Sequence, residues 1–533
     1  MSYVDTFAND HLPPKSLQPE YPFLEGPFAF PSRLNCTHRL LDDHIEHGRG
    51  ACIAMQTFEH QWTYRQLYET ANRIAHALIT DYGLVPGNRV LIRSANNPMM
   101  VACWFGVLKA GGIAVATMPL LREKELHVMC DCAEISHALC DERLMDEMRL
   151  VTSPFLQTVI TFDGTQTKPA ELERKMEGKP AHFENFDTSA DDVCLIGFTS
   201  GTTGKPKMTA HYHRDVLAIC EAFPRYSLQP KPEDIFTGSP PLGFTFGLGG
   251  LVLFPFYYGA SSFLIEKPTP ELLLKAIQDF GITVCFTAPT AWRIITTKVG
   301  DYNISTLRKC VSAGETLPAK VWLDWHEATG LKIIDGIGAT EMLHIFISST
   351  EENMKIGATG VPVFGYEARI VDAYGNELGP DVPGRLAVRG ITGCKYLMRE
   401  DKQREYVENG WNITGDVFKR DDDGYFWFVG RGDDMIISSG YNIGAVEVES
   451  VLLEHPEIAE CAVVGCADEE RGMLVCAHIV LKNHDKASDT LAIQIQEWFK
   501  LKAAPYKYPR MIIFTQALPK TETGKVQRFK LKQ

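Results

Sequence analysis

The sequence feature that most constrains the fold is a repeated alternation of short apolar segments with amphipathic helical segments. Residues 62–81 carry apolar side chains at helical spacing and include Thr63, a residue type that caps helix N-termini. A strand predicted at Arg89–Ser94, a helix at Pro98–Ala110 and a strand around Ile113–Thr117 follow. Strand, helix and strand at this spacing are typical of a βαβ unit, so the sequence predicts an open parallel sheet.

The same alternation recurs in the middle of the chain. It comprises a strand at Asp192–Phe198 followed by a helix, a strand at Val284–Ala288 followed by a helix, a strand at Lys309–Ser312, a helix around Ala319–Ala328 and a strand at Lys332–Ile334. Parallel strands need such crossover connections, and helices usually supply them. The predicted fold class is therefore α/β.

The pattern changes after about residue 365. Short strands at Ala368–Val371, Gly384–Val388 and Tyr425–Val429 are separated by turns rich in Gly, Pro and Asp. They predict a small antiparallel β subdomain over about residues 365–430. A polar, glycine-rich segment, Gly430–Asp434, follows it and reads as a linker.

The last part of the chain has a pattern of its own. It predicts a helix at 445–454, strands at 459–464 and 474–481, a helix at 488–502 and a strand at 511–514. At roughly 100–200 residues per domain, 533 residues allow two to four domains. We therefore expect a large N-terminal domain of parallel and mixed sheets wrapped by helices, residues 1–432 with the β subdomain included. A small α+β domain, residues 433–533, would follow.

Charge and cysteine content exclude several classes of protein. The chain has 53 Lys and Arg against 67 Asp and Glu, a net charge of −14, whereas nucleic-acid binding needs a basic surface. The 14 cysteines are scattered, and the first residues lack a secretory signal, so we expect buried, reduced thiols in the cytoplasm. Neither Cys130 with Cys132 nor Cys461 with Cys466 has the spacing of a zinc site.

One uncharged stretch, Thr237–Ile265, is long enough to span a bilayer. It contains Pro240, Pro241, Pro255 and six glycines, which would interrupt a continuous helix, and no basic flank marks an orientation. We therefore expect a buried, glycine-rich wall that approaches a ligand, and no association with a membrane.

The strongest local motif directly follows the strand predicted at Asp192–Phe198. It reads TSGTTGKPK and comprises Thr199, Ser200, Gly201, Thr202, Thr203, Gly204, Lys205, Pro206 and Lys207. The glycines allow a tight turn that presents backbone N–H groups to a phosphate, while hydroxyls and lysines add donors and charge. The spacing differs from that of the P-loop, GxxxxGK[ST], and for an isolated motif a solvated loop is an equal alternative.

This motif resembles the phosphate-binding signature of the adenylate-forming enzymes, which include acyl- and aryl-CoA ligases, luciferase-like enzymes and peptide-synthetase adenylation domains. Five further segments resemble the other signatures of that superfamily, in the same order. They are Ser312–Leu317 and Asp335–Glu341 for adenine and magnesium, Trp411–Asp416 and Gly430–Asp434 for the ribose and the hinge, and Pro519–Lys525 for the C-terminal catalytic lysine. The chain is identified as a member of this superfamily.

The resemblance implies an ATP site built from these segments. Beyond the phosphate motif, the implied nucleotide-binding residues are Gly314, Glu315, Asp335, Gly336, Ile337, Asp416, Phe428 and Arg431, with Asp416 and Arg431 on the ribose hydroxyls. Thr340 would contact the α-phosphate, and Glu341 would hold Mg²⁺ through hard carboxylate oxygens. Without the resemblance, Glu341 is interpreted as an acidic residue that is favoured near a helix N-terminus. Asp416 and Arg431 are then interpreted as surface turn residues.

The resemblance also explains a separate, mobile C-terminal domain. Lys525 would contact the attacking carboxylate and the α-phosphate, and rotation about Asp433 would then clear the site for a thiol. The rotated domain would bring Gly440 and Tyr441 to CoA as binding residues. Many relatives have Gly-Gly-Glu where this chain has Ser439-Gly440-Tyr441, so the role of that glutamate does not pass to Tyr441. Taken alone, Lys525 is an ordinary exposed lysine.

The acyl pocket of the superfamily is formed by three segments. In this chain they supply the expected substrate-binding residues Phe244, Phe246, Ala288, Gly338, Ala339 and His344. Aromatic residues next to small ones suit a flat ring better than a long alkyl chain. Any one of these aromatic residues could equally be part of the hydrophobic core. His344 could equally have a structural role or form a hydrogen bond with a substituent on the ring of the substrate.

Longer runs, among them SPPLGFTFGLGGLVLFPF and DGIGATEMLHIFIS, resemble the aryl-CoA ligases, most closely the 2-aminobenzoate (anthranilate)–CoA and benzoate–CoA ligases. The resemblance implies conversion of an aromatic acid to its CoA thioester through an aryl adenylate. The implied cofactors are ATP, Mg²⁺ and CoA, and the only expected partners are small molecules. We expect a cytoplasmic protein that is a monomer or a homodimer. The alternatives are an adenylation enzyme that loads a separate carrier protein, a medium-chain fatty acyl-CoA ligase, and a non-enzymatic nucleotide-binding module.

Overall fold

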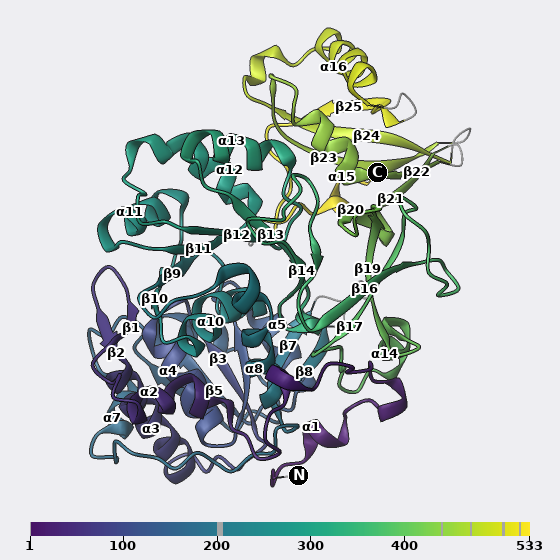
Figure 1. Ribbon diagram of the computed structural model, residues 1–533. Coiled ribbons are helices and arrows are strands. Elements are labelled where there is room, and N and C mark those ends of the chain that lie inside the picture. The colour runs from purple at the N-terminus through teal and green to yellow at the C-terminus, as the bar shows by residue number, and fades with distance from the viewer. Residues whose placement is uncertain are drawn as a thin grey trace.

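The computed structural model describes residues 2–199, 206–438, 441–468, 472–503, 507–521 and 524–532. Their strands form two large sheets, one small antiparallel sheet and one sheet near the C-terminus, and helices pack around the two large sheets (Figure 1). The predicted α/β class, with a large N-terminal part and a smaller C-terminal α+β part, is confirmed.

The first large sheet holds the predicted βαβ units. Its strand order is β6-β5-β3-β4-β7-β8, and all neighbouring strands in it are parallel except β7 and β8. The strands are β3 (Arg89–Arg93), β4 (Ile113–Thr117), β5 (His137–Asp141), β6 (Thr158–Phe162), β7 (Val193–Thr199) and β8 (Lys207–Tyr212). The helices up to this point are α1 (Phe7–Asp10), α2 (Asp43–Glu46), α3 (Tyr64–Thr80), α4 (Pro98–Lys109), α5 (Glu123–Cys132), α6 (Met145–Met148), α7 (Glu171–Met176) and α8 (His213–Glu221).

Helix α3 begins where the sequence predicted. The Thr63 side chain accepts a hydrogen bond from the Gln66 N–H at 3.2 Å, and the Gln66 side chain accepts one from the Thr63 N–H at 2.8 Å. This reciprocal capping box satisfies two N–H groups at the start of the helix. Further along, Ile74 packs against α4 at Gly106, where a Cβ would lie 2.5 Å from the Ile74 Cγ2, so the close contact between the two helices needs glycine.

The helix predicted after the strand at residues 192–198 is present as α8, which begins at His213. Between β7 and α8 lies the antiparallel strand β8, which the sequence did not predict. Every residue of β8 after Lys207 is buried. Because both faces of this strand are covered, it lacks the alternation of polar and apolar residues that marks a half-buried strand.

The second large sheet is larger and mixed. Its order is β15-β14-β13-β12-β11-β9-β10-β1-β2, parallel from β13 to β1 and antiparallel at both ends. The strands are β1 (Ile53–Gln56), β2 (Gln61–Thr63), β9 (Ile235–Gly238), β10 (Ser261–Phe263), β11 (Val284–Thr287), β12 (Lys309–Ala313), β13 (Ile333–Gly338), β14 (Ile345–Ser348) and β15 (Val361–Pro362). The helices of this part are α9 (Thr245–Leu248), α10 (Phe254–Tyr257), α11 (Pro270–Phe280), α12 (Pro289–Lys298) and α13 (Ala319–Thr329).

The uncharged, glycine-rich stretch connects β9 to β10 and is mostly buried, as predicted, but its backbone differs from the expectation. Helix α9, a π-helical turn at Gly249–Leu253 and helix α10 follow one another without a break. Close contacts explain two of the six glycines, because a Cβ at Gly249 would lie 2.3 Å from His344 and one at Gly250 would lie 2.7 Å from Phe286. Among the described residues, no helix combines the length and the apolar character needed to cross a bilayer.

The predicted small antiparallel sheet is present, and it contains a central strand, β19, that was not expected. Its order is β16-β17-β19-β18, and β20 pairs with β19. Strand β19 was not predicted as a strand, although part of it had been recognised as a motif. The elements are β16 (Tyr366–Val371), β17 (Gly384–Gly390), α14 (Glu400–Tyr406), β18 (Val407–Glu408), β19 (Trp411–Arg420) and β20 (Phe426–Arg431).

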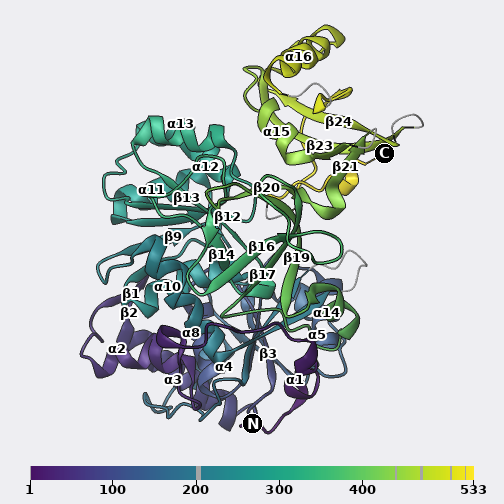
Figure 2. The same ribbon diagram turned by 45° about the vertical axis from the view of Figure 1, so that its right-hand side comes forward.

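The C-terminal sheet has a core of its own, formed by residues such as Ile436, Val463, Val475 and Phe499. Its order is β22-β21-β24-β23, and β25 pairs with β24. The elements are β21 (Met435–Ser438), β22 (Tyr441–Gly444), α15 (Ala445–Leu452), β23 (Ile458–Asp468), β24 (Gly472–Leu481), α16 (Asp489–Lys502) and β25 (Met511–Phe514). Both views place this part at one end of the molecule, beyond β20 (Figure 2). The sequence missed β21 and β22, and the domain boundary at Asp433 stays a prediction.

A buried ion pair joins α8 to the segment after β17. Lys395 Nζ lies 2.9 Å from Asp215 Oδ2, and both side chains are 0% exposed. Lys395 Nζ also lies 3.2 Å from the Gly393 carbonyl oxygen and 3.4 Å from the Tyr21 hydroxyl. Breaking such a pair by removing one partner is costly, because the other charge stays buried without compensation.

We expect Lys395→Met to lower the free energy of unfolding by about 3–5 kcal/mol, because it leaves Asp215 buried and unpaired. Urea unfolding followed by tryptophan fluorescence measures the change. The control is Lys275→Met on α11, which removes an exposed ion pair with Asp279 and should leave the unfolding midpoint unchanged. An equal shift in the two variants would contradict the importance of the buried pair.

Candidate active site

The first and last residues of the phosphate motif, Thr199 and Lys207, lie on the two paired strands β7 and β8. Thr199 ends β7 and pairs with Lys207, the first residue of β8. The predicted residues Ser200, Gly201, Thr202, Thr203, Gly204 and Lys205 lie outside the described residues. The Thr199 hydroxyl is buried and has no hydrogen-bond partner in the described part of the chain. Since a buried hydroxyl without a partner is costly, Thr199 is well placed to donate to a bound anion.

The turn that carries Thr340 and Glu341 packs directly against these two strands. It is a 3₁₀ turn, Thr340–Met342, that follows β13. The His211 ring on β8 donates from Nε2 to the Thr340 carbonyl oxygen at 2.7 Å, and burial lowers the pKa of His211 to about 4, so the ring is neutral. On β7, a Cβ at Gly197 would lie 2.7 Å from the Thr340 Cγ2. The two large sheets therefore meet where the predicted phosphate and magnesium residues lie.

Glu341 faces Lys207 and a tyrosine that the sequence did not indicate. Glu341 Oε1 accepts a hydrogen bond from the Tyr396 hydroxyl at 2.5 Å, and the same hydroxyl lies 2.8 Å from Lys207 Nζ. Lys207 Nζ is 4.0 Å from Glu341 Oε1. No described residue forms a hydrogen bond or ion pair with Glu341 Oε2. A hard carboxylate oxygen beside a phosphate motif fits Mg²⁺ carried by a nucleotide.

The backbone next to this turn is strained. Leu343 is fully buried and has φ of +69° and ψ of −36°, a combination that residues with a side chain rarely adopt. Packing of the Leu343 side chain in the core holds this conformation. As a result, Glu341 and His344 are three residues apart in the chain but lie in different surroundings, one polar and one aromatic.

Aromatic side chains enclose His344. Its ring lies 4.5 Å from that of Phe254 in an edge contact, 5.8 Å from Phe246 and 6.0 Å from Phe223, measured between ring centroids. His344 is 3% exposed, and burial lowers its pKa to about 3, so the imidazole is neutral. Among the described residues, neither ring nitrogen has a hydrogen-bond partner of good geometry, although the nearby Phe246 backbone partly offsets the effect of burial on the pKa. A ligand that reached this ring would find one donor and one acceptor nitrogen without a strong hydrogen bond.

The other predicted pocket residues lie near this enclosure and are less buried. Phe246 packs against Phe286 with centroids 5.7 Å apart. The remaining predicted residues are half-buried or exposed, which suits the wall of an open pocket; they are Phe244, Ala288, Gly338 and Ala339. Ala288 directly precedes helix α12.

The predicted adenine segments lie on neighbouring strands. Ala313 pairs with Gly336, and Ser312 pairs with Asp335, between β12 and β13. Burial raises the pKa of Asp335 to about 8, so its carboxyl group is protonated at neutral pH, and its Oδ1 has no partner among the described residues. A protonated carboxyl offers one donor and one acceptor, the pattern that an adenine edge requires. The half-buried Ile337 follows on β13.

A glycine and a glutamate link the adenine segment to the acyl segment. Gly314 has φ of +87° and open space where a Cβ would be, so its conformation rather than its size requires glycine. The next residue, Glu315, accepts a hydrogen bond from the Thr290 hydroxyl at 2.7 Å. Thr290 lies two residues after Ala288, so this hydrogen bond fixes the position of one segment relative to the other.

The predicted ribose residues form a pair across two strands. Asp416 on β19 is the register partner of Arg431 on β20, and Arg431 Nη1 donates to Asp416 Oδ1 at 2.9 Å. Burial raises the pKa of Asp416, against the attraction of Arg431. Phe428, on the same strand as Arg431, packs edge-on against Phe418 with centroids 5.2 Å apart. The structure thus brings Asp416, Phe428 and Arg431 together on β19 and β20.

The predicted C-terminal residues do not join the other groups through any described contact. Asp433 lies in the 3₁₀ turn Gly432–Asp434, between β20 and β21, and its side chain lies outside the described part, as do Gly440 and the Tyr441 side chain. Lys525 is exposed, and its N–H donates to the Thr521 hydroxyl at 3.1 Å. Its ammonium makes no hydrogen bond or ion pair with a described residue.

An ion pair holds the C-terminal part against helix α12. Arg293 donates to the Ala459 carbonyl oxygen and to Glu460 Oε1, both at 2.6 Å. Glu460 also accepts from Lys520 at 2.6 Å, and these cations outweigh burial and lower its pKa. Helix α12 begins at the predicted acyl turn, so the acyl segment and the contact with the C-terminal part share one helix.

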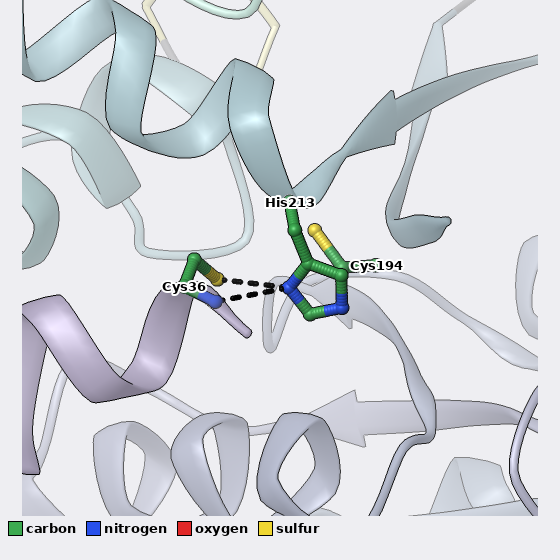
Figure 3. Close-up of side chains that lie close together, drawn as sticks. All are labelled: Cys36, Cys194 and His213. Atoms are coloured by element: carbon green, nitrogen blue, oxygen red, sulfur yellow. Dashed lines mark hydrogen bonds between the residues drawn. The ribbon is translucent and has the colours of Figure 1, made fainter. Parts of the chain in front are cut away.

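A separate cluster of metal-ligating residue types lies in the N-terminal half. Cys36, Cys194 and His213 are buried, and their ligand atoms lie within 4.8 Å of one another (Figure 3). His213 Nδ1 accepts a hydrogen bond from the Cys36 N–H at 3.2 Å and lies 3.3 Å from its sulfur, while the Tyr3 hydroxyl lies 3.4 Å from Nε2. The protein itself occupies the Nδ1 lone pair, so we interpret the cluster as a structural link between the N-terminal segment, β7 and α8.

Comparison with known proteins agrees with this geometry. Residues 45–398 match the family model described as AMP-binding enzyme, and residues 447–525 match that of the AMP-binding enzyme C-terminal domain. The chain is 33% identical over 514 residues to a benzoate–CoA ligase from Thauera aromatica, covering 94% of this chain and 96% of the relative. It is 32% identical over 491 residues to the mitochondrial acyl-coenzyme A synthetase ACSM3 from Mus musculus, covering 89% and 84%.

A solved structure is also similar. The anthranilate CoA ligase AuaEII, crystallised in complex with anthranoyl-AMP, superposes with a TM-score of 0.89 at 34% identity, covering 95% of this chain and 98% of that one. The predicted resemblance to the adenylate-forming superfamily and its aryl-CoA ligases is confirmed. The chain belongs to the AMP-binding enzyme family.

Proposed function

We propose that this protein, an AMP-forming acid–thiol ligase by family, converts an aromatic carboxylic acid to its CoA thioester through an aryl adenylate. AMP and pyrophosphate are released, and 2-aminobenzoate or benzoate is the preferred acid. The observation that carries the proposal is the aromatic enclosure of a neutral His344 without partners, three residues from Glu341. Relatives named as benzoate– and anthranilate–CoA ligases support the same class of acid.

In the first half-reaction, a carboxylate oxygen of the acid bonds to the α-phosphorus of ATP, and the bond to pyrophosphate breaks. Both reactants are anions, so cations and oriented donors lower the barrier. Lys207 would stabilise phosphate charge, and the hydroxyls of Thr199 and Thr340 would donate to phosphate oxygens. Mg²⁺ held at Glu341 would supply Lewis-acid stabilisation of the same phosphates.

The enclosure around His344 selects the acid. Aromatic walls at Phe246 and Phe254 suit a flat ring, because ring pairs favour edge and offset contacts. A neutral imidazole has one N–H donor and one acceptor nitrogen. An amino group next to the carboxyl group of the acid would give His344 the hydrogen bond that it lacks.

In the second half-reaction, the CoA thiol gives up its proton and its sulfur bonds to the acyl carbon, while the bond from that carbon to the phosphate oxygen breaks and AMP leaves. We infer two domains, residues 1–432 and 433–533, with Asp433 as the hinge. The exposed Lys525 would serve adenylation, and Gly440 and Tyr441 would contact CoA after rotation. The small polar contact of Arg293 with Glu460 supports a domain that can change position.

One other thiol acceptor and one other class of acid remain as alternatives. A separate carrier protein could replace CoA, and a medium-chain fatty acid could replace the aromatic acid. Similarity to an acyl-coenzyme A synthetase keeps the second of these open. The cytoplasmic location and the monomeric or dimeric state are predictions as well.

A substrate panel tests the proposal. AMP release is measured with ATP, Mg²⁺ and CoA for benzoate, 2-aminobenzoate, hexanoate and octanoate. We expect kcat/KM for the better aromatic acid to exceed that of either alkyl acid by at least about tenfold, because the enclosure is aromatic. Thioester formation only with the alkyl acids would refute the aromatic assignment, and adenylation without CoA transfer would favour a carrier protein.

Replacement of the C-terminal lysine tests its proposed role. We expect Lys525→Ala to lower adenylate formation by at least about 100-fold, because one cation leaves the charged transition state. Thioester formation from supplied aryl-AMP and CoA should persist. Lys530→Ala removes another exposed lysine of the same segment and is the control. Undiminished pyrophosphate release by Lys525→Ala would contradict the assignment.

His344→Phe tests the proposed contact with a ring substituent. The change keeps an aromatic ring but removes both nitrogens. The preference for 2-aminobenzoate over benzoate, as a ratio of kcat/KM values, should fall by about 2- to 13-fold, the value of one neutral hydrogen bond. Phe223→Leu, which alters the enclosure without removing a polar atom, is the control. A ratio that does not change in His344→Phe would show that His344 makes no such contact.

A further inference from the structure

The hydroxyl of Tyr396 lies between the two charged groups of the site. It is 2.8 Å from Lys207 Nζ and 2.5 Å from Glu341 Oε1, while the ammonium and the carboxylate are 4.0 Å apart. An ammonium can only donate, so the Tyr396 oxygen accepts from Lys207. Its single proton is therefore donated to Glu341, and the direction of both hydrogen bonds is determined.

The surroundings of Tyr396 hold this hydroxyl in place. The residue is 1% exposed, and its N–H donates to Gln403 Oε1 at 2.8 Å. Gln403 in turn donates to the Leu17 carbonyl oxygen at 2.9 Å. Tyr406 packs against the Tyr396 ring with centroids 5.6 Å apart and planes at 72°, and Thr209 of β8 forms a β-bridge with Tyr396. The hydroxyl cannot turn away without a shift of these neighbours.

Without the hydroxyl, the two charges would be free to form a direct ion pair. The side chains of Lys207 and Glu341 are only 21% and 10% exposed, so water screens their attraction weakly. A direct pair would turn the ammonium away from phosphate and occupy the carboxylate. One hydroxyl prevents this, because it gives each group a hydrogen bond at a fixed separation.

We propose that Tyr396 is a positioning residue that keeps Lys207 and Glu341 apart, so that the ammonium faces the phosphates of ATP and the carboxylate faces the divalent cation. The inference rests on the proposed function for the identity of these ligands. Glu341 Oε2, which has no hydrogen bond from the described residues, is the oxygen that this arrangement leaves for the cation.

The test is the metal dependence of nucleotide binding, which needs no turnover. The dissociation constant of a fluorescent ATP analogue is measured in Mg²⁺ and in EDTA. The ratio of the EDTA value to the Mg²⁺ value reports how much the metal strengthens binding. We expect Tyr396→Phe to lower this ratio by about tenfold, the value of one lost hydrogen bond to a charged group. A ratio equal to that of the wild type would overturn the proposal.

Tyr64→Phe is the matched control. Tyr64 is also fully buried, and its hydroxyl donates one hydrogen bond, to the Ala260 carbonyl oxygen at 2.6 Å, away from the site. The ratio for this variant should stay within about twofold of the wild type, since the hydrogen bond that it loses lies away from the site. An equal fall in both variants would mean that Tyr396 acts through general stability, against the proposal.

A second variant separates positioning from a packing defect. In Tyr396→Phe/Lys207→Met no ammonium is left to occupy Glu341, so the ratio should recover toward the wild-type value. A ratio no higher than that of Tyr396→Phe would overturn the proposal. The measurement uses no aromatic acid, so a wild type that binds ATP in a metal-dependent way but makes no aryl-CoA refutes the proposed function alone. A wild type that binds no nucleotide refutes both.

Discussion

The contact between the paired strands β7 and β8 and the Thr340–Met342 turn makes a single site from two sheets. Thr199 and Lys207 come from the first large sheet, and Glu341 follows the second. They meet only because Gly197 leaves room for the Thr340 side chain and His211 donates to the Thr340 carbonyl oxygen. Burial and a hydrogen bond, rather than attraction between charges, thus bring the charged groups together. The buried ion pair of Asp215 and Lys395 joins α8, which follows β8, to the segment that carries Tyr396.

Much of the fold could be predicted from the sequence, because local periodicity reports burial. The strand at 113–117 and the cap at Thr63 lie where the pattern placed them. The motifs that resemble ribose-binding segments brought attention to Asp416 and Arg431, which the structure joins as register partners; their role in nucleotide binding stays a prediction. The strand and the cap were predicted correctly because a short stretch of chain carries its own signal, through alternation or a capping residue.

The failures share one physical cause, dependence on contacts between distant parts of the chain. Strand β8 lacks alternation because both faces are covered, so it was not predicted. Tyr396 lies in a segment without a local sequence signal. Its possible role follows only from its contact with Lys207, which is 189 residues away in the chain. The strained backbone of Leu343 is likewise a product of the packed core and has no signature in sequence.

The π-helical turn at Gly249–Leu253 has a consequence for how the acyl wall can change. A π turn contains one residue more than an α turn closed by the same kind of hydrogen bond, and such turns are often found at functional sites. Each residue of an α-helix rotates the chain by about 100°. Deletion of one residue in this turn would therefore rotate Phe246 about the helix axis relative to Phe254, by about 100°. The strands on either side would keep their register. If the proposed function holds, the length of this turn would set how Phe246 and Phe254 face the acid, a property that aligning aromatic residues alone would overlook.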